Sequence, residues 1–295
     1  MPYKILKKKQ LDKSGILVEI DIHAPLIAKK ANPGNFVLIR INEKGERFPL
    51  TIADFDRSQG RITLVFQIVG KSTLLLSHQE QGGELLDVVG PLGNEIQIKK
   101  YENPIVIIGG GVGIAPCYPQ AKAFKEAGNS IISILGARTS DLIFWQDKMA
   151  ALSDKLIITT NDGSEGLKGF VTVPLKDILA EEKISLVIAI GPLIMMKNVA
   201  LMTSGIEGLP KIKTLVSLNT IMVDGTGMCG GCRFASKNGE IHFACVEGPD
   251  VDGHMVDFDI LLNREKRFID LEKKSYDLYK QECKVLEEIE KNKKI

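Results

Sequence analysis

From Tyr101 onward the chain repeats one pattern, an apolar strand, a glycine turn and a helix. The first unit reads PIVIIGGGVGIAP and then CYPQAKAFKEAGN, and the second reads SIISILGAR and then SDLIFWQDKMAAL. KLIITTND continues the pattern, and SLVIAIGP leads into LIMMKNVALMTSG. Uninterrupted apolar strands that alternate with helices are typical of a parallel sheet covered on both faces. We therefore predict a doubly wound parallel α/β domain over residues 99–218, with a linker near Lys99–Pro104.

The chain before this domain has a different rhythm. Short β-type runs, separated by turn residues, read GILVEIDI, NFVLIRI, FPLTIADF, RITLVFQIV and GELLDVVGPLG. Such spacing favours an antiparallel β barrel or sandwich. Contiguous leucines within Thr73–His78 favour one helical interruption. We place this all-β domain at residues 1–98.

The chain after the α/β domain changes character twice. Residues 219–260 are glycine-rich and irregular, and they show no periodicity that would bury a core of their own. Something other than hydrophobic burial must order this small loop domain. Residues 261–295 are highly charged, with apolar residues at the spacing of one helical stripe. We predict a C-terminal helical tail there.

The overall charge of the chain does not indicate a macromolecular partner. The 38 Lys and Arg residues nearly cancel the 37 Asp and Glu residues, which argues against binding to nucleic acid or an anionic membrane surface. The N-terminal stretch MPYKILKKKQ lacks the apolar run of a secretory signal, and no stretch approaches the roughly 18 apolar residues of a membrane span. We therefore expect a cytoplasmic protein.

Three of the five cysteines lie in the irregular segment: Cys229, Cys232 and Cys245. An odd cysteine count and this clustering fit a reducing compartment and a metal site better than a disulfide framework. CxxC spacing by itself suits either zinc or an iron–sulfur cluster, and the cluster normally takes four protein ligands. For zinc, His242 or His254 is available as a further ligand. Cys117 and Cys283 stand apart, and we expect packing or surface roles for them. For Cys117 the alternative is a thiol at the start of a helix, where the helix N-terminus would lower its pKa.

Two glycine turns in the α/β domain point to a nucleotide. In an open parallel sheet, ligands bind beyond the carboxyl ends of the strands, where both turns and the loop TTNDGSEG would meet. Glycine lets the backbone approach a phosphate at the start of a helix. Met195 and Met196 are expected to pack. The candidate nucleotide-binding residues are Gly109, Gly110, Gly111, Val112, Gly113, Asp162, Gly191 and Pro192. For Asp162 a simple Asn-Asp-Gly turn is the alternative.

Arg47 and Thr51 stand in the barrel at the start of one expected strand. Arginine can bind a phosphate bidentately, and a threonine hydroxyl can hydrogen-bond a planar ring system. A surface arginine on an edge strand is the alternative.

The motifs together resemble the ferredoxin–NADP reductase superfamily. Arg47, Phe48, Pro49, Leu50 and Thr51 are similar to its R-x-Y/P-x-S/T flavin motif. Its second flavin segment resembles Val69, Gly70, Lys71, Ser72 and Thr73. GGGVGIAP and GPLIMM are similar to its pyridine-nucleotide segments, in the same order along the chain. The resemblance implies an antiparallel Greek-key barrel that binds FAD, a domain that binds NAD(H) or NADP(H), and a catalytic role for Thr51 beside the flavin.

The cysteine patch resembles two narrower families of electron-transfer subunit. One serves dihydroorotate dehydrogenase, and the other is the small subunit of NADH-dependent ferredoxin:NADP oxidoreductase, also described as sulfide dehydrogenase. Both imply a [2Fe-2S] cluster. Laying the pattern C-x4-C-x2-C on the loop puts Asp224 in the first ligand position, and an aspartate there is expected of the second family. The implied ligands are Asp224, Cys229, Cys232 and Cys245.

The resemblance implies an oxidoreductase subunit that passes electrons between NAD(H), FAD and the cluster. The implied partner is a large bifurcating flavin and iron–sulfur subunit of ferredoxin:NADP oxidoreductase. An electron-transfer subunit of dihydroorotate dehydrogenase is the alternative, with the same cofactors. A zinc-bearing nucleotide sensor without redox chemistry is the third interpretation. No arginine cluster follows the third nucleotide strand, which favours NAD over NADP.

Overall fold

The computed structural model describes residues 3–206, 208 and 210–293, so residues 1, 2, 207, 209, 294 and 295 of the predicted domains lie outside the described residues. The N-terminal part is an antiparallel sheet of seven strands in the order β6-β1-β2-β5-β4-β3-β7. The strands are β1 (Tyr3–Gln10), β2 (Leu17–His23), β3 (Phe36–Arg40), β4 (Phe48–Asp56), β5 (Arg61–Gln67), β6 (Glu84–Leu85) and β7 (Asp87–Leu92).

Closure of this sheet follows from its connectivity. β6 and β7 stand at opposite ends of the strand order, yet only Leu86 separates them along the chain. The two edges must therefore lie close together, and the sheet curls into a nearly closed barrel, which confirms the predicted fold class. Two helices flank it, α1 (Pro25–Lys30) and α2 (Lys71–Ser77). α2 is the expected helical interruption.

The second domain is a seven-stranded sheet in the order β11-β10-β9-β8-β12-β13-β16. Its strands are β8 (Ile105–Gly110), β9 (Ile131–Ala137), β10 (Lys155–Thr160), β11 (Leu167–Lys168), β12 (Leu186–Ile190), β13 (Thr214–Ser217) and β16 (Asp250–Asp252). All neighbours are parallel except β16, which runs antiparallel to β13. The helical segments between them are η1 (Gly111–Gly113), α3 (Ile114–Glu126), η2 (Ser140–Leu142), α4 (Gln146–Ala150), α5 (Thr172–Glu181) and α6 (Leu193–Met202).

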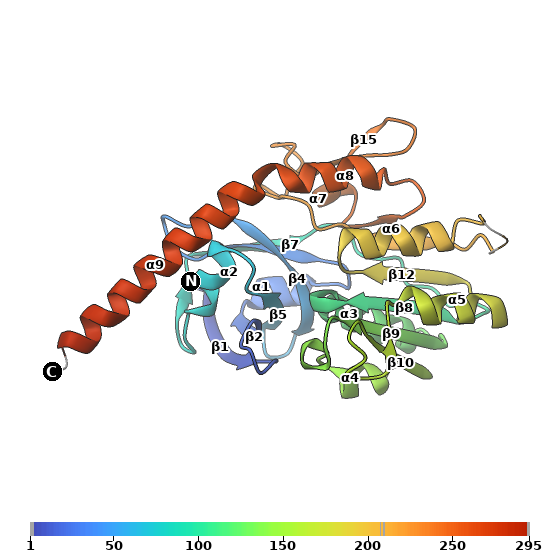
Figure 1. The fold of residues 1–295 in the computed structure, drawn as a ribbon, viewed down its shortest axis with the longest axis horizontal. Helices are drawn as coiled ribbons and strands as arrows, with labels where there is room; N and C mark the ends of the chain where they lie inside the picture. Colours follow the sequence, from blue (N-terminus) through green and yellow to red (C-terminus); the bar gives the residue numbers. More distant parts are fainter. Residues whose placement is uncertain (1–2, 207, 209, 294–295) are drawn as a thin grey trace.

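Helices cover both faces of this sheet (Figure 1). Val106 and Ile108 of β8 belong to the core cluster shared with α5 and α6, whereas Ile105 and Ile107 belong to the cluster shared with α3 and α4. Successive residues of one strand thus face two different cores, which explains why the strand has no polar alternation. The predicted doubly wound sheet is confirmed.

The segment after β13 is less irregular than its sequence suggests. It contains the hairpin β14 (Arg233–Ala235) and β15 (Ile241–Phe243), the short helix α7 (Ala244–Glu247), and β16. Its buried residues Cys232, Phe234 and Val251 join the core cluster of α5 and α6. The segment therefore packs on the α/β domain and adds a strand to its sheet, so that part of its order comes from burial against that domain. The predicted domain boundaries themselves stay a prediction.

The tail is helical, as predicted. α8 (Phe258–Glu265) and η3 (Lys266–Phe268) lead into α9 (Ile269–Lys293), which projects past the barrel in Figure 1. α9 rests on α2, where the rings of Tyr279 and His78 lie 6.2 Å apart and Lys71 Nζ lies 5.8 Å from the Tyr279 ring. The helical tail therefore extends from the segment of residues 219–260 back to the barrel.

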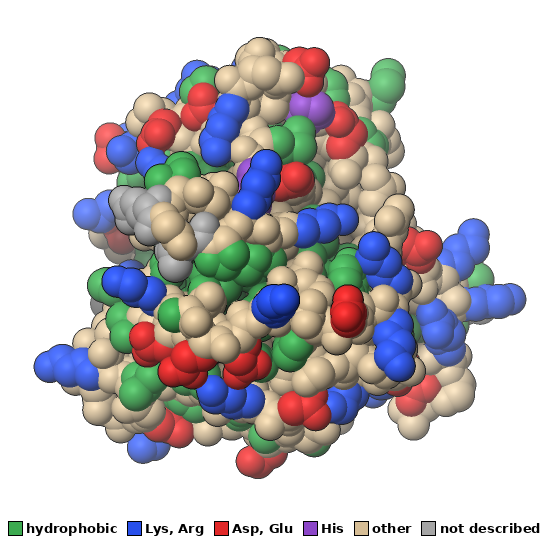
Figure 2. All heavy atoms as spheres, turned by 90° about the vertical axis from the view of Figure 1, so that its right-hand side faces the viewer, with side chains coloured by type: hydrophobic (Ala, Val, Ile, Leu, Met, Phe, Trp, Pro, Cys, Tyr) green, Lys and Arg blue, Asp and Glu red, His purple; other side chains and the backbone are tan. Residues whose placement is uncertain are grey.

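On the face shown in Figure 2, basic and acidic side chains are interspersed. This pattern agrees with the near-zero net charge of the chain. Among the described residues, none of the helices combines the length and the apolar character that crossing a membrane requires.

Candidate cofactor and cluster sites

The two predicted glycine turns meet at the centre of the parallel sheet. β8 and β12 are neighbours, while β9 lies on the other side of β8, so the connections diverge here as at a topological switch point. Gly110 ends β8 and Gly191 follows β12; a Cβ on Gly191 would lie 3.0 Å from the Gly110 Cα. The structure thus brings these turns together at the strand ends where α/β domains bind ligands.

Two glycines of the first turn serve different purposes. A Cβ on Gly113 would lie 2.2 Å from the backbone oxygen of Ile190, so this position holds α3 close to β12. Gly111 instead has a positive φ of 56°, and nothing lies within 4 Å of the place its Cβ would occupy. Close packing accounts for Gly113, and the turn conformation accounts for Gly111. Met195 packs here too, because its Sδ would meet a Cβ on Gly110 at 2.4 Å.

Cys117 lies just behind this turn, in the first part of α3. Its side chain is fully buried, and a Cβ on Gly109 would lie 3.2 Å from its Sγ. Burial raises the pKa of the Cys117 thiol well above its usual range, with the charge of Asp250 acting in the same direction. This is the packing role expected from the sequence, and not an activated thiol.

Asp162 lies in the exposed loop after β10. Its carboxylate accepts hydrogen bonds from the backbone N–H of Ser164 (3.0 Å) and from the Ser164 hydroxyl (2.7 Å). These bonds lower the pKa of Asp162. The geometry is that of a local aspartate turn, and a contact of Asp162 with a nucleotide stays a prediction.

The two flavin-like segments lie side by side in the barrel. Arg47, just before β4, pairs with Asp87 of β7 at 2.7 Å. Glu46, the preceding residue, hydrogen-bonds the hydroxyl of Ser72 at the start of α2. Thr51 lies in β4 opposite Phe36 of β3. The five residues of the first segment and the start of α2 are thus joined through Glu46 and Ser72.

Around Gly70 the second segment is ordered by its own threonine. Thr73 Oγ1 accepts the backbone N–H groups of Val69 (3.0 Å) and Gly70 (3.1 Å). Val69 and Lys71 are exposed. The segment therefore presents a loop of fixed shape on the barrel surface beside Ser72.

The cysteine loop holds its candidate ligands in two pairs. Cys232 and Cys245 are buried, with their Sγ atoms 3.1 Å apart and not joined in a disulfide. Asp224 and Cys229 form the second pair, since an Asp224 carboxylate oxygen accepts the backbone N–H of Cys229 at 2.6 Å. A binuclear cluster takes two protein ligands at each iron. The loop therefore offers the four donors that such a cluster needs, with Asp224 held by the backbone of Cys229 and not by its thiol.

The charge states of these groups have local causes. Hydrogen bonds from the backbone N–H of Thr226 and then of Cys229 lower the pKa of Asp224, which is half-buried. Burial raises the pKa of the Cys245 thiol to about 12, and its hydrogen bond with Cys232 acts in the same direction. A thiol held protonated by burial must lose that proton to become a ligand, so the binding of iron and the deprotonation of Cys245 are coupled.

The histidines that would complete a zinc site have other partners. His242 Nδ1 lies 2.7 Å from a Glu247 carboxylate oxygen, and His254 Nε2 lies 3.0 Å from the Thr203 hydroxyl. Within the described part of the chain, no three His, Cys, Asp or Glu side chains gather closely enough to hold a metal ion, and this applies to the four candidate ligands as well as to the histidines.

The cysteine loop also touches the barrel. A Cβ on Gly225 would lie 2.6 Å from the Leu92 side chain and 3.1 Å from that of Leu38. Asn94, just after β7, donates its side-chain amide to the backbone oxygen of Val246 at 2.9 Å. The candidate cluster site therefore lies against the domain that carries the flavin-like segments, as electron transfer between them would require.

One buried polar pair was not found from the sequence. Gln120 of α3 donates to the Asp250 carboxylate of β16 at 2.7 Å, while Gln120 Oε1 and Asp250 Oδ1 are buried without a partner. A Cβ on Gly34, in the barrel, would lie 2.8 Å from Asp250 Oδ2. Burial raises the pKa of Asp250 to about 6, although hydrogen bonds from Ser217 and Gln120 act against it.

The replacement Asp250→Asn is expected to change how stability depends on pH. A folded-state pKa above the unfolded value means that the folded protein holds the proton more tightly, so the Asp250 contribution to stability decreases as pH rises from about 4 to 6. Above pH 7 the ionised carboxyl destabilises the fold by about 3 kcal/mol. We therefore expect the variant to be the more stable protein at pH 8 and to lose this difference near pH 4. Urea unfolding at both values measures it, and equal differences at the two pH values would contradict the assignment.

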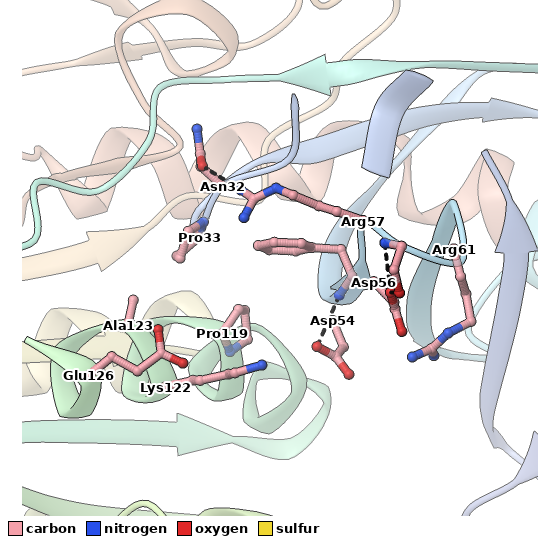
Figure 3. Close-up of a pocket in the computed structure, with 12 residues that line it drawn as sticks. Asn32, Pro33, Asp54, Asp56, Arg57, Arg61, Pro119, Lys122, Ala123 and Glu126 are labelled. Atoms are coloured by element: carbon pink, nitrogen blue, oxygen red, sulfur yellow. Dashed lines mark hydrogen bonds between the residues drawn. The ribbon is translucent and has the colours of Figure 1, made fainter. Parts of the chain in front are cut away.

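A cavity of about 620 Å³ lies between the β4–β5 turn and α3 (Figure 3). Its walls carry both charges, from Arg57, Arg61 and Lys122 and from Asp54, Asp56 and Glu126. None of the residues singled out in the sequence lines it. We therefore do not assign a cofactor to this cavity.

Comparison with known proteins agrees with this arrangement. The family model of the oxidoreductase NAD-binding domain matches residues 107–200. The model of the iron–sulfur cluster binding domain of dihydroorotate dehydrogenase B matches residues 219–257. The second match goes against the zinc interpretation, because the segment resembles an iron–sulfur domain.

Three similar proteins span most of the chain. A Thermotoga maritima protein, a homolog of the dihydroorotate dehydrogenase B (NAD(+)) electron transfer subunit, is 49% identical over 88% of this chain and 89% of its own. The corresponding subunit of Fusobacterium nucleatum is 32% identical over 78% and 89%. A solved structure of an NADH-dependent reduced ferredoxin–NADP oxidoreductase, described for flavin-based electron bifurcation, is 44% identical with a TM-score of 0.87, over 95% of this chain and 98% of that one. The chain therefore belongs to the family of the dihydroorotate dehydrogenase B electron-transfer subunits, oxidoreductase subunits with an FAD-binding barrel, an NAD-binding domain and an iron–sulfur domain.

Proposed function

We propose that this chain is the small subunit of a bifurcating NADH-dependent ferredoxin:NADP oxidoreductase, and that it exchanges electrons with a large flavin and iron–sulfur subunit. The observation that carries the proposal is the pairing of Asp224 with Cys229 in a loop whose other donors are Cys232 and Cys245. A carboxylate in the first ligand position separates this loop from the four-cysteine loop of the dihydroorotate dehydrogenase type. The similarity to the solved oxidoreductase over nearly the whole chain supports the same reading.

We assign FAD to the barrel. In this proposal Arg47 exchanges its pairing with Asp87 for a bidentate contact with the flavin pyrophosphate, which its exposed position permits. Thr51 presents its hydroxyl to the flavin ring and is the catalytic residue of the set. The remaining barrel residues assigned to FAD are Phe48, Pro49, Leu50, Val69, Gly70, Lys71, Ser72 and Thr73.

We assign the nicotinamide nucleotide to the turns at the switch point. The backbone of Gly109 to Gly113 approaches its phosphates at the start of α3, and Gly191 and Pro192 bound the site on the β12 side. Asp162 is assigned to its ribose or nicotinamide side. NAD is preferred to NADP because no arginine cluster follows the third nucleotide strand.

Bound flavin would link the two-electron chemistry of nicotinamide to the one-electron chemistry of a cluster, because flavin can transfer electrons in pairs or singly. The protein contributes the positions of the sites, because the cysteine loop meets the barrel around Leu38, Leu92 and Gly225. The backbone N–H groups of Thr226 and Cys229 hold the Asp224 carboxylate in its charged form. The expected cytoplasmic location remains a prediction.

Replacement of Asp224 by alanine tests the ligand set. The variant should keep its flavin absorbance but lose the cluster or change its EPR spectrum, because one iron loses its oxygen donor. Iron analysis and EPR of the dithionite-reduced protein measure this. Asp162→Ala is the matched control, since that carboxylate also accepts local backbone hydrogen bonds but lies outside the loop. A spectrum identical to that of the unchanged protein would remove Asp224 from the ligands.

The second candidate is the electron-transfer subunit of dihydroorotate dehydrogenase, which is favoured by the family model matched at residues 219–257. Affinity purification of the tagged chain from its native host distinguishes the two. A co-purifying large subunit that contains flavin and iron–sulfur clusters and reduces NADP would support the first proposal. A co-purifying dihydroorotate-oxidising subunit would support the second and contradict the first.

A further inference from the structure

The barrel and the α/β domain are joined by directional contacts made by the segment between β9 and β10. The Asp141 carboxylate of η2 accepts the backbone N–H of Lys13, in the β1–β2 turn, at 3.1 Å. The indole N–H of Trp145, just before α4, donates to Glu19 of β2 at 2.9 Å. Both contacts cross from one domain to the other.

Trp145 adopts an unfavourable backbone conformation to make its contact. Its φ of 55° is left-handed, and among the described residues it is the only non-glycine with a positive φ. Such a conformation costs about 1–3 kcal/mol and persists only where surrounding contacts determine it. The rings of Tyr118 and Phe144 meet the indole edge-on, with centroids 5.4 Å and 5.8 Å away. The fold thus stabilises a strained residue whose N–H points at the barrel.

Glu19 is an unusual partner for this contact, because it is a charged residue in the middle of a barrel strand and only 8% exposed. The nearby cation is Lys148 of α4, whose Nζ lies 3.7 Å from the Trp145 ring centroid. Burial lowers the pKa of Lys148, while the charges of Glu19 and Asp54 act in the opposite direction. The Trp145 indole therefore contacts a carboxylate through its N–H and an ammonium group through its ring face.

Apolar packing cannot by itself fix the angle between the domains. Leu17, Ala53 and Val65 of the barrel share a core cluster with Ile114 and other residues of the α/β domain. Such contacts are not directional and tolerate small rotations. The hydrogen bonds of Trp145 and Asp141 are directional and are made at two different places on the barrel.

We propose that Trp145 and Glu19 are positioning residues for hydride transfer, forming an interdomain latch that fixes the orientation of the nucleotide domain against the flavin-binding barrel. The inference rests on the proposed function, because the hydride donor is assigned to one domain and the acceptor to the other. Reacting atoms must approach to about 3–3.5 Å, and a displacement of 1 Å can slow a reaction by roughly a hundredfold. A latch that fixes the orientation of the two domains therefore affects the hydride-transfer rate constant, although neither of its residues is assigned to a cofactor.

The test uses the purified protein with its FAD and cluster in place. Glu19→Ala removes the acceptor, Glu19→Gln keeps it without the charge, and Trp145→Phe removes the N–H while keeping a packed ring. Glu80→Ala is the control, since Glu80 forms an exposed ion pair with Lys8 at 3.2 Å. Stopped-flow reduction of the flavin by NADH gives the hydride-transfer rate constant and the Kd of NADH. Deuterated NADH gives the isotope effect, and the fluorescence of Trp145, the single tryptophan, reports its surroundings.

We expect Glu19→Ala and Trp145→Phe to lower the hydride-transfer rate constant by about tenfold or more, with the Kd of NADH nearly unchanged. The isotope effect should increase, and Trp145 emission should shift in Glu19→Ala. Glu19→Gln and Glu80→Ala should behave like the unchanged protein. Equal rate constants in all variants would overturn the latch while leaving the proposed function intact. If the unchanged protein is not reduced by NADH at all, the proposed function itself fails.

Discussion

Replacement of Cys245 by alanine is expected to give a protein that keeps its FAD but contains no iron–sulfur cluster. Cys245 is 2% exposed and lies 3.1 Å from Cys232, so its loss leaves one iron with a single protein ligand. No other thiol can replace it, because Cys117 is buried in α3 and Cys283 lies in α9. NADH should still reduce the flavin. Transfer onward to a one-electron acceptor should slow by at least about a hundredfold, since even supporting residues of metal sites carry effects of 10–100-fold.

Iron and sulfide analysis, EPR and the visible spectrum measure this outcome. Cys283→Ala makes the same chemical change outside the loop and should leave all three unchanged. The reason for the difference is structural: Cys245 lies 3.1 Å from Cys232 in the cysteine loop, whereas Cys283 lies in α9. A Cys245→Ala protein that retains two irons per chain would show that the cluster is held by other residues.

Replacement of Gly113 by alanine is expected to weaken both the fold and nucleotide binding. The new Cβ would lie 2.2 Å from the Ile190 backbone oxygen, and a backbone atom cannot turn aside as a side chain can. Forced overpacking of this kind costs about 3 kcal/mol, equivalent to a decrease in Tm of roughly 6–12 °C. Because α3 must move away from β12, NADH binding at the switch point should weaken by about tenfold or more. Thermal unfolding and NADH titration measure the two effects.

Gly111→Ala is the matched comparison two residues away. Nothing lies within 4 Å of its added Cβ, so its cost is confined to the left-handed φ of 56° and should be about 1 kcal/mol. The two variants thus separate close packing from turn conformation within one glycine run. Equal losses of stability in both would contradict the distinction drawn from the structure.

The fold could be predicted because each domain repeats one periodic pattern. The β8 run Ile105 to Ile108 is apolar at every position because alternate residues enter two cores, and this is visible in the sequence. β16 could not be predicted in the same way. Its Asp-Val-Asp sequence has a single apolar residue, and it becomes a strand only because β13 offers an edge for pairing.

The same distinction applies to the residues of the candidate site: those close together in the sequence could be predicted, and contacts between distant segments could not. Residues joined by short sequence spacing, such as Cys229 and Cys232 or Gly109 to Gly113, could be predicted from motifs. Contacts between distant segments could not: Trp145 with Glu19, Gln120 with Asp250, and Gly225 against Leu38 and Leu92. Each depends on how segments far apart in the sequence pack together, and a local residue pattern contains no information about such packing. A buried glutamate in the middle of GILVEIDI was the only hint.

Because β16 belongs to the segment that carries the cysteines and pairs with β13, the stability of this segment and that of the nucleotide domain are coupled. β16 pairs along Thr214–Ser217 and shields what would otherwise be a bare edge of the parallel sheet. Were the segment to detach, for example after oxidative damage to its metal, unpaired amides and carbonyls of β13 would face other chains and invite intermolecular strand addition. Loss of the inorganic centre would then cause the whole polypeptide to self-associate, in addition to stopping electron transfer.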